Sequence, residues 1–265
     1  MELTRRDRRV VTLVWLGSII VLWEVLAAVL LFLIQDNMAS SKLPFPHDVL
    51  ITFVGEWRSL LTAGFVTLSR AGLGFAIGGM IGVTLAVVMS LSKIAEKIAF
   101  PYLIVSQMIP VLGLAPIIFN IVRDMNMSRI VIAAYITFFP VAVNMLSGFK
   151  SVEDEKKELM RSIAANRVDI YLKLMFPYSL PYLFTGLKIA APMAVTASIL
   201  VDMLGSKSGI GVRILYSLYS SSFDIFWASV FTSAFMGILS YNIVIFAERL
   251  FIPWKNVASK KVGAK

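Results

Sequence analysis

The sequence contains no cysteine, a single histidine and few charged residues for its length. Lys, Arg, Asp and Glu make up 15% of the 265 residues, against about a quarter in a soluble globular domain. The missing cysteines exclude disulfides and thiolate chemistry. A lone histidine, His47, excludes a histidine metal site and a two-histidine relay. We therefore expect no metal centre and interpret His47 as a solvated loop residue.

Motifs for phosphate binding and hydrolysis are missing as well. No Gly-x-x-x-x-Gly-Lys-Ser/Thr phosphate loop occurs, and residues 205–209 have its composition without its spacing. Neither Gly-x-Ser-x-Gly nor His-Glu-x-x-His is present. The chain is therefore not expected to hydrolyse ATP or to carry catalytic residues.

Long hydrophobic runs dominate what is present. Hydrophobic residues make up 58% of the chain, and its mean hydropathy is +0.81, as in integral membrane proteins. A membrane-spanning helix needs about 20 apolar residues, and six runs reach that length. We predict an all-α integral membrane protein with about six transmembrane helices, at 10–34, 64–91, 98–122, 129–149, 182–204 and 223–251.

Lys and Arg are distributed unevenly among the connecting segments. With the N-terminus in the cytosol, 18 of the 25 basic residues lie on the cytosolic side, 6 lie outside and Arg70 lies within a span. Because basic loops stay in the cytosol, this orientation is favoured. It predicts a cytosolic arm at 1–9, one transmembrane domain at 10–254 and a cytosolic tail at 255–265. The net charge of +9 is then loop charge and indicates no nucleic-acid partner.

Charged residues inside the apolar runs include Glu24, Arg70, Lys188 and Asp202. Charges there are costly and usually face protein. Glu24 would contact solute or protons, or form a buried hydrogen bond with a neighbouring helix; we prefer the hydrogen bond. Lys188 is expected to extend toward the cytosolic surface. Arg70 and Asp202 fall at similar depth near the outer face, so we predict an intramembrane ion pair between them.

Small residues recur every fourth position in the second predicted span. Gly74, Gly78, Gly82 and Ala86 share one helical face, where missing side chains let backbones approach closely. This face forms a dimer or pore-lining seam, or it packs inside one subunit. Packing inside the subunit is the preferred interpretation.

Prolines interrupt the third predicted span at 101, 110 and 116. Membrane helices tolerate proline where neighbours or water satisfy the freed carbonyl groups. We therefore expect a kinked helix that faces a cavity, with Gln107 and Asn120 as polar groups along it.

The segment 150–181 is the only long polar insert between hydrophobic runs. Its pattern predicts two short amphipathic helices, at 153–165 and 168–176, with Pro177 ending the second. Loops that are long and patterned are usually functional. Since the topology places this segment in the cytosol, it is interpreted as a docking surface.

Residues Glu158–Arg167, with Phe176–Pro181, resemble the EAA loop of ABC-importer permeases. That pattern is Glu-Ala-Ala, three residues, Gly, and a spacer that ends in Leu-Pro. Here Leu159 and Met160 stand at the Ala pair, and Ala164 stands at the Gly. Glu158, Arg161, Ser162, Ala165, Arg167, Leu180 and Pro181 match the pattern. The resemblance implies that positions of this loop couple the chain to an ATPase. These positions are Glu158, Arg161, Ser162, Ala164, Ala165, Asn166, Leu180 and Pro181.

Four further motifs resemble the nitrate/sulfonate/taurine permease group and extend the likeness from about 43 to 254. They are Leu-Pro-Phe-Pro at 43–46, Thr-Leu-Ser-Arg at 67–70, Phe-Phe-Pro at 138–140 and Ser-Gly-Ile-Gly at 208–211. Ile-Phe-Asn at 118–120 departs from the Trp-Phe-Gly that members of this group often carry.

The resemblance implies the permease subunit of an ATP-driven importer in a bacterial cytoplasmic membrane. In that family the EAA loop lies in a groove of a separate ATPase subunit, which binds Mg-ATP. An external binding protein delivers the solute, and two permease copies form the pathway. The solute would be a small anion, such as a sulfonate or nitrate, or a molecule like a vitamin precursor. We assign Glu158 and Arg161 to polar contact with the ATPase or to helix capping, or merely to an i,i+3 pair with each other. Ala164 and Ala165 are assigned to close approach of the loop to its partner.

Two other classes of function stand beside the importer: an ion-coupled secondary transporter and a membrane enzyme. An ion-coupled secondary transporter would use Glu24, Arg70 and Asp202 as ion-coupling groups. Such proteins often contain internal repeats, and 10–97 shows no self-similarity to 129–254. A membrane enzyme would need a clustered catalytic set. Neither class gives the segment 150–181 a task.

Overall fold

Helices account for the regular structure of the chain. The computed structural model describes residues 5–33 and 43–254, and these ranges contain α-helices and two π-helical turns but no strand. The predicted all-α class is confirmed. The predicted tail at 255–265 lies outside the described residues, as do residues 1–4 of the predicted arm.

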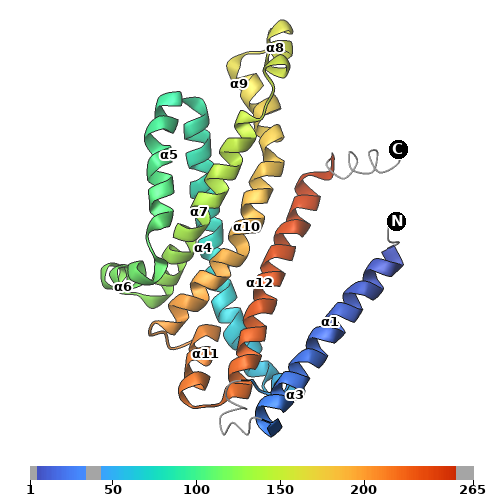
Figure 1. The fold of residues 1–265 in the computed structure, drawn as a ribbon. Helices are drawn as coiled ribbons and strands as arrows, with labels where there is room; N and C mark the ends of the chain where they lie inside the picture. The colour runs from blue at the N-terminus through green and yellow to red at the C-terminus, as the bar shows by residue number, and fades with distance from the viewer. Residues whose placement is uncertain (1–4, 34–42, 255–265) are drawn as a thin grey trace.

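The elements follow one another with short connections (Figure 1). They are α1 (Arg5–Ala28), the π-helical turn η1 (Val29–Leu33), α3 (Pro46–Gly55), α4 (Trp57–Leu91), α5 (Lys93–Met108), α6 (Val111–Val122), α7 (Met125–Lys150), α8 (Asp154–Ser162), α9 (Arg167–Ile170), the π-helical turn η2 (Tyr171–Met175), α10 (Phe176–Met203), α11 (Ile210–Tyr219) and α12 (Phe223–Phe251).

Within the described ranges, four helical stretches are long and apolar enough to cross a membrane. They are α4, α7, the continuous stretch Arg167–Met203, and α12. A fifth would be α5 with α6, which are bent by 99° against each other at a short break. The chain is therefore a multi-pass membrane protein. The total of six spans and the cytosolic side of both termini stay predictions.

The predicted small-residue face of α4 lies against α7 of the same chain. A Cβ atom added at Gly74 would lie 2.6 Å from the Ile130 carbonyl oxygen, and one at Gly82 would lie 2.5 Å from that of Phe138. At Gly78 it would lie 2.8 Å from the Thr137 Cβ. Because Cβ atoms do not approach other atoms so closely, the glycines let the two helix backbones pack directly together.

Glycine also allows α7 and α10 to pack closely. A Cβ atom at Gly148 would lie 2.8 Å from the Cβ of Tyr182, and one at Gly186 would lie 2.7 Å from the Pro140 carbonyl oxygen. The helices α4, α7 and α10 therefore form a tightly packed unit that runs the length of the molecule (Figure 1).

Helix α1 leans away from this unit, and the C-terminal end of α1 meets the other helices (Figure 1). The Trp23 indole donates a hydrogen bond to the Pro44 carbonyl (3.0 Å), and its ring stacks on Phe231 at a centroid distance of 5.5 Å. One end of α1 is thus fixed by an aromatic contact with α12.

Two sequence-based boundaries were wrong. Pro177 does not end a helix, because it occupies the first turn of α10, where proline is tolerated. The π-helical turn η2 joins that helix directly to α9. The Ser- and Gly-rich region 205–222, left as a connection between the predicted spans 182–204 and 223–251, contains α11, whose Ile210, Ile214 and Ser217 are buried at helical spacing.

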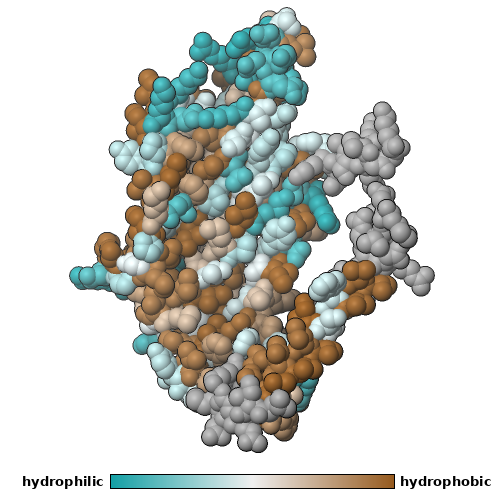
Figure 2. All heavy atoms as spheres, viewed as in Figure 1, coloured by the Kyte–Doolittle hydropathy of each residue, from teal (hydrophilic) through white to brown (hydrophobic). Residues whose placement is uncertain are grey.

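The surface changes character along the molecule. Figure 2 shows hydrophobic residues gathered over its middle and hydrophilic residues covering the end formed by α8 and α9. This polar end contains the segment predicted to dock on a partner.

Candidate functional site

The α8–α9 segment projects beyond the long helices at one end of the molecule (Figure 1). No residue of α8 is buried. Leu159 is 66% exposed, and Ile163, directly after the helix, is 69% exposed. A polar helix that presents apolar side chains to water is typical of a surface that is covered by a partner.

Charges on α8 are arranged to favour the helix. Its first turn contains Asp154 and Glu155 and its last turn contains Arg161, as the helix dipole prefers. A hydrogen bond from Lys157 (2.9 Å) lowers the pKa of the Asp154 carboxyl below its ordinary value. Within the described residues, no ion pair joins Arg161 to Glu158. The i,i+3 pair considered for these two side chains is therefore not formed, and both stay available at the surface.

Helix α8 ends in a left-handed turn at the position of the EAA-loop glycine. The Ala165 N–H donates to the Met160 carbonyl (3.0 Å), and the Ala164 N–H donates to that of Arg161 (2.9 Å). These two bonds define a Schellman motif, in which the residue after the cap is left-handed and usually glycine. Ala164 has φ of 59°. The turn is thus kept although a side chain replaces the glycine.

The other predicted coupling residues take different positions. Asn166 caps α9, since its side chain accepts a hydrogen bond from the Asp169 N–H (2.8 Å). The Ser162 hydroxyl donates to the Leu159 carbonyl (2.8 Å). Leu180 packs beside the buried cluster around Phe184. Leu180 and its neighbour Pro181 therefore belong to the base of the segment, inside α10, rather than to its exposed surface.

A tyrosine that was not singled out from the sequence ties this segment to the core. The hydroxyls of Tyr171 and Ser90 are hydrogen-bonded at 2.8 Å, and the Tyr171 ring stacks on Phe149 at a centroid distance of 5.3 Å. Tyr171 thus joins η2 to both α4 and α7. Its place in the apolar period 168, 171, 172, 175 was the available signal, but periodicity alone does not identify a polar contact.

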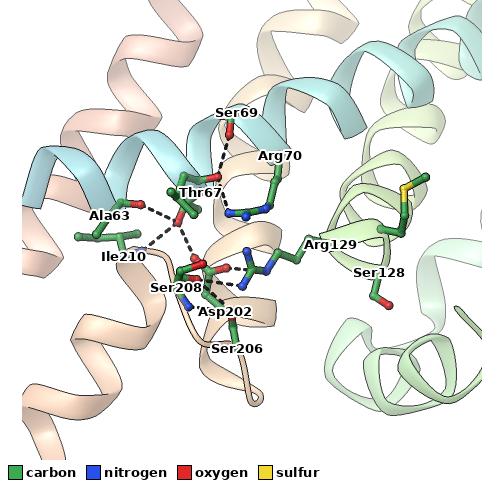
Figure 3. Close-up of polar contacts among 12 residues, drawn as sticks. Ala63, Thr67, Ser69, Arg70, Ser128, Arg129, Asp202, Ser206, Ser208 and Ile210 are labelled. Carbon is green, nitrogen blue, oxygen red and sulfur yellow. Dashed lines mark hydrogen bonds and ion pairs between the residues drawn. The ribbon is translucent and has the colours of Figure 1, made fainter. Parts of the chain in front are cut away.

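The opposite part of the core contains a buried ionic cluster (Figure 3). The side chains of Arg129 and Asp202 are 2% and 0% exposed, and the Arg129 Nε lies 3.0 Å from an Asp202 carboxylate oxygen. Thr67 donates to the other carboxylate oxygen (2.5 Å) and accepts from the Ile210 N–H (2.9 Å). Arg129 also donates to the Ser208 carbonyl (2.9 Å). The cluster therefore connects α4, α7 and α10 with the start of α11.

The predicted pairing of Arg70 with Asp202 is replaced by the pair with Arg129. Arg70 lies beside the cluster (Figure 3), but its guanidinium donates to the Val66 carbonyl of its own helix (3.0 Å). Arg70 and Asp202 lie near each other (Figure 3), and rotation about the helix axis decides which arginine faces the carboxylate. Arg129 begins the predicted span 129–149 and was counted among the six basic residues outside the membrane, so its burial was missed.

Two of the sequence motifs meet in this cluster. Thr67 and Arg70 belong to the Thr-Leu-Ser-Arg motif, and Gly209 belongs to Ser-Gly-Ile-Gly. Gly209 has φ of 121°, and a Cβ atom there would lie 2.5 Å from the Asp202 carboxyl carbon. Any other residue would clash with the carboxylate, so the glycine is required by the buried charge.

The remaining charges of the predicted spans are paired between helices. The Glu24 carboxylate accepts a hydrogen bond from His47 Nδ1 (2.8 Å). The bond joins neighbouring helices as predicted, but it is exposed and not buried. His47 is solvated as predicted but lies in the first turn of α3, not in a loop. Lys188 lies 3.0 Å from Glu248 of α12. Lys188 lies near the middle of α10 and pairs with a neighbouring helix, in place of the predicted extension toward the cytosolic surface.

Comparison with known proteins agrees with this geometry. The model of the family described as binding-protein-dependent transport system inner membrane component matches residues 78–255. The chain is 28% identical to the formylaminopyrimidine transport permease protein ThiX of Halalkalibacterium halodurans, over 80% of this chain and 86% of that protein. It is 25% identical to the putative aliphatic sulfonates transport permease protein SsuC of Bacillus subtilis, over 90% of this chain and 85% of that protein.

The fold is also found among solved structures. An amino acid ABC transporter chain, solved with histidines, superposes with a TM-score of 0.62 at 17% identity, covering 75% of this chain and 97% of that one. The family match over 78–255 includes the α8–α9 segment, Gly78 and Gly82 of the α4 face, and the buried pair Arg129 and Asp202. The chain belongs to the family of binding-protein-dependent transport system inner membrane components, the permeases of ABC importers.

Proposed function

We propose that the chain is the membrane-spanning subunit of an ATP-driven importer in a bacterial cytoplasmic membrane and that its α8–α9 segment docks on a separate ATPase. The observation that carries this proposal is the exposure of α8, none of whose residues is buried, with the apolar Leu159 and the adjacent Ile163 facing solvent. An amphipathic helix of this kind fits a groove on a partner protein.

The helix connectivity supports a role in transmitting force. From Arg167 to Met203 the chain is helical without a break, and at 1.5 Å per residue this stretch is about 55 Å long. Tyr171 holds its first part against α4. When the ATPase subunits bind Mg-ATP and close, movement of α8 is passed to α10 and α4 together.

The remaining partners complete the importer. Two copies of the chain enclose one pathway, related by a two-fold axis normal to the membrane, and lipid surrounds them. An external binding protein delivers the solute. The relatives named for formylaminopyrimidine and aliphatic sulfonates indicate a small heteroaromatic molecule or a small anion.

Co-purification tests the docking. The chain is isolated from its native membranes in mild detergent, and co-eluting proteins are identified by mass spectrometry and their mass ratio determined. We expect an ATPase subunit with a phosphate loop, at one copy per permease. Leu159→Glu should remove it. Tyr219→Glu, at a residue that is 79% exposed on α11, is the matched control and should leave it bound.

The opposite result would support an ion-coupled transporter. If the chain elutes without an ATPase and ATP does not alter uptake in reconstituted vesicles, the importer assignment is wrong. Binding that survives Leu159→Glu would instead show that the ATPase docks elsewhere.

A further inference from the structure

The break between α5 and α6 is stabilised by a side chain from α7. Pro110 has no N–H, so the Ser106 carbonyl four residues earlier lacks its helical partner. The Tyr135 hydroxyl donates a hydrogen bond to this carbonyl. Ile109 is extended, with φ of −78° and ψ of 120°, as residues before proline prefer. The 99° bend is therefore a built feature of the fold.

This break lies at membrane depth. The Lys150–Glu96 ion pair sets a common level for α7 and α5. Ile109 follows Glu96 by 13 residues, or about 20 Å along α5, and Tyr135 precedes Lys150 by 15 residues, or about 22 Å along α7. Both distances are shorter than the hydrocarbon thickness of about 30 Å. Figure 1 shows α6 lying across the long helices at this level.

Irregular backbone at such depth is tolerated only where protein buries it or where it lines a water-filled cavity. In this chain Met108 is 72% exposed and Ile109 is 45% exposed. The Gln107 amide nitrogen is buried without a hydrogen-bond partner among the described residues. The chain therefore leaves Met108 and Ile109 uncovered and the Gln107 amide nitrogen unsatisfied, and lipid offers no hydrogen-bond partner.

The groups around the break are polar but uncharged. Residues 98–122 contain no Asp, Glu, Lys or Arg. They offer the amides of Gln107 and Asn120, with the phenol of Tyr135 beside them and apolar side chains between. An ion that leaves water needs an opposite charge to offset its desolvation, whereas a neutral molecule needs only hydrogen bonds and apolar contact.

We propose that the α5–α6 break, with Gln107 and Tyr135, is the solute-contact segment of an aqueous pathway and that it favours uncharged, planar solutes with amide-like hydrogen-bonding groups over inorganic anions and sulfonates. This inference rests on the proposed importer function and narrows its two solute classes to the heteroaromatic one.

The lack of native cysteine makes the test direct. Met108→Cys and Ile117→Cys introduce single thiols at residues that are 72% and 57% exposed, where no core packing is lost. Ile238→Cys, 60% exposed near the middle of the unbroken helix α12, is the control outside the proposed pathway. The complex in lipid nanodiscs is treated with anionic and with neutral hydrophilic thiosulfonate reagents, without nucleotide and with Mg-ATP.

We expect labelling at Met108→Cys and Ile117→Cys at least about tenfold faster than at Ile238→Cys, because a thiol in lipid does not ionise. The rate of each reagent at Met108→Cys and Ile117→Cys is divided by its rate at Tyr219→Cys, on the exposed face of α11. This relative rate should be higher for the neutral reagent than for the anionic one. Equal rates at Met108→Cys, Ile117→Cys and Ile238→Cys in both nucleotide states would overturn the pathway. Equal relative rates of the two reagents would overturn the preference for uncharged solutes. Labelling requires no ATP hydrolysis, so its failure is distinct from loss of the ATPase in co-purification.

Discussion

Replacing Ala164 by glycine should stabilise the end of α8. Ala164 is the left-handed residue of the Schellman motif, with φ of 59°. A left-handed conformation costs an L-residue with a side chain about 1–2 kcal/mol. Glycine avoids this cost but loses about 0.5–1 kcal/mol more backbone freedom on folding. The net gain is therefore about 0.5–1 kcal/mol, which is about a two- to fivefold change in the local opening equilibrium.

Hydrogen exchange measures this gain directly. The N–H groups of Ala164 and Ala165 both donate to α8 carbonyls, so their exchange reports opening of the turn. In the full chain in nanodiscs, Ala164→Gly should slow exchange at 164–165 by that factor. Ala165 is not left-handed, so Ala165→Gly is the matched control and should speed exchange. Unchanged or faster exchange in Ala164→Gly would refute the assignment of the turn.

Three further changes test the packing described above. Gly78→Val should lower the melting temperature, since overpacking costs about 1–3 kcal/mol. Gly72→Val should not, because a Cβ atom at Gly72 meets nothing within 4 Å. Equal melting temperatures of the two variants would contradict the close packing of α4 on α7. Arg129→Met should cost about 3–5 kcal/mol by leaving the Asp202 carboxylate unpaired, and wild-type thermal stability would show that the pair is not buried. Tyr171→Phe removes a hydrogen bond worth about 1 kcal/mol and should speed exchange across 171–175, whereas unchanged exchange would exclude the bond.

Helix positions followed from the sequence where one physical signal dominated. The apolar runs predicted α4, α7 and α12 because length and hydrophobicity decide such helices. The helical part of 205–222 was missed because its Ser and Gly content outweighed the buried spacing of Ile210 and Ile214. Composition describes the surface of such a segment, while the period of its apolar residues describes its packing.

The site was predictable in outline but not in its contacts. The polar insert and its EAA-like pattern identified the α8–α9 segment, because local sequence determines helix ends and turns. The partner of Asp202 could not be derived, since Arg70 and Arg129 both lie at the right depth and only the rotation of packed helices selects between them. The prolines of 98–122 predicted a kink, but the 99° bend also requires Tyr135, which is distant in sequence.

The unbroken path from α9 through η2 to α10 fixes the spacing between the docking segment and the membrane core. One added residue in an α-helix turns everything beyond it by about 100° and shifts it by about 1.5 Å. An insertion between Ile170 and Phe184 would therefore point α8 away from its partner while leaving each half intact. The π-helical turn η2 lies in this stretch, and such turns inside helices are frequent at functional sites. We expect relatives to differ here by substitution and to keep the length unchanged.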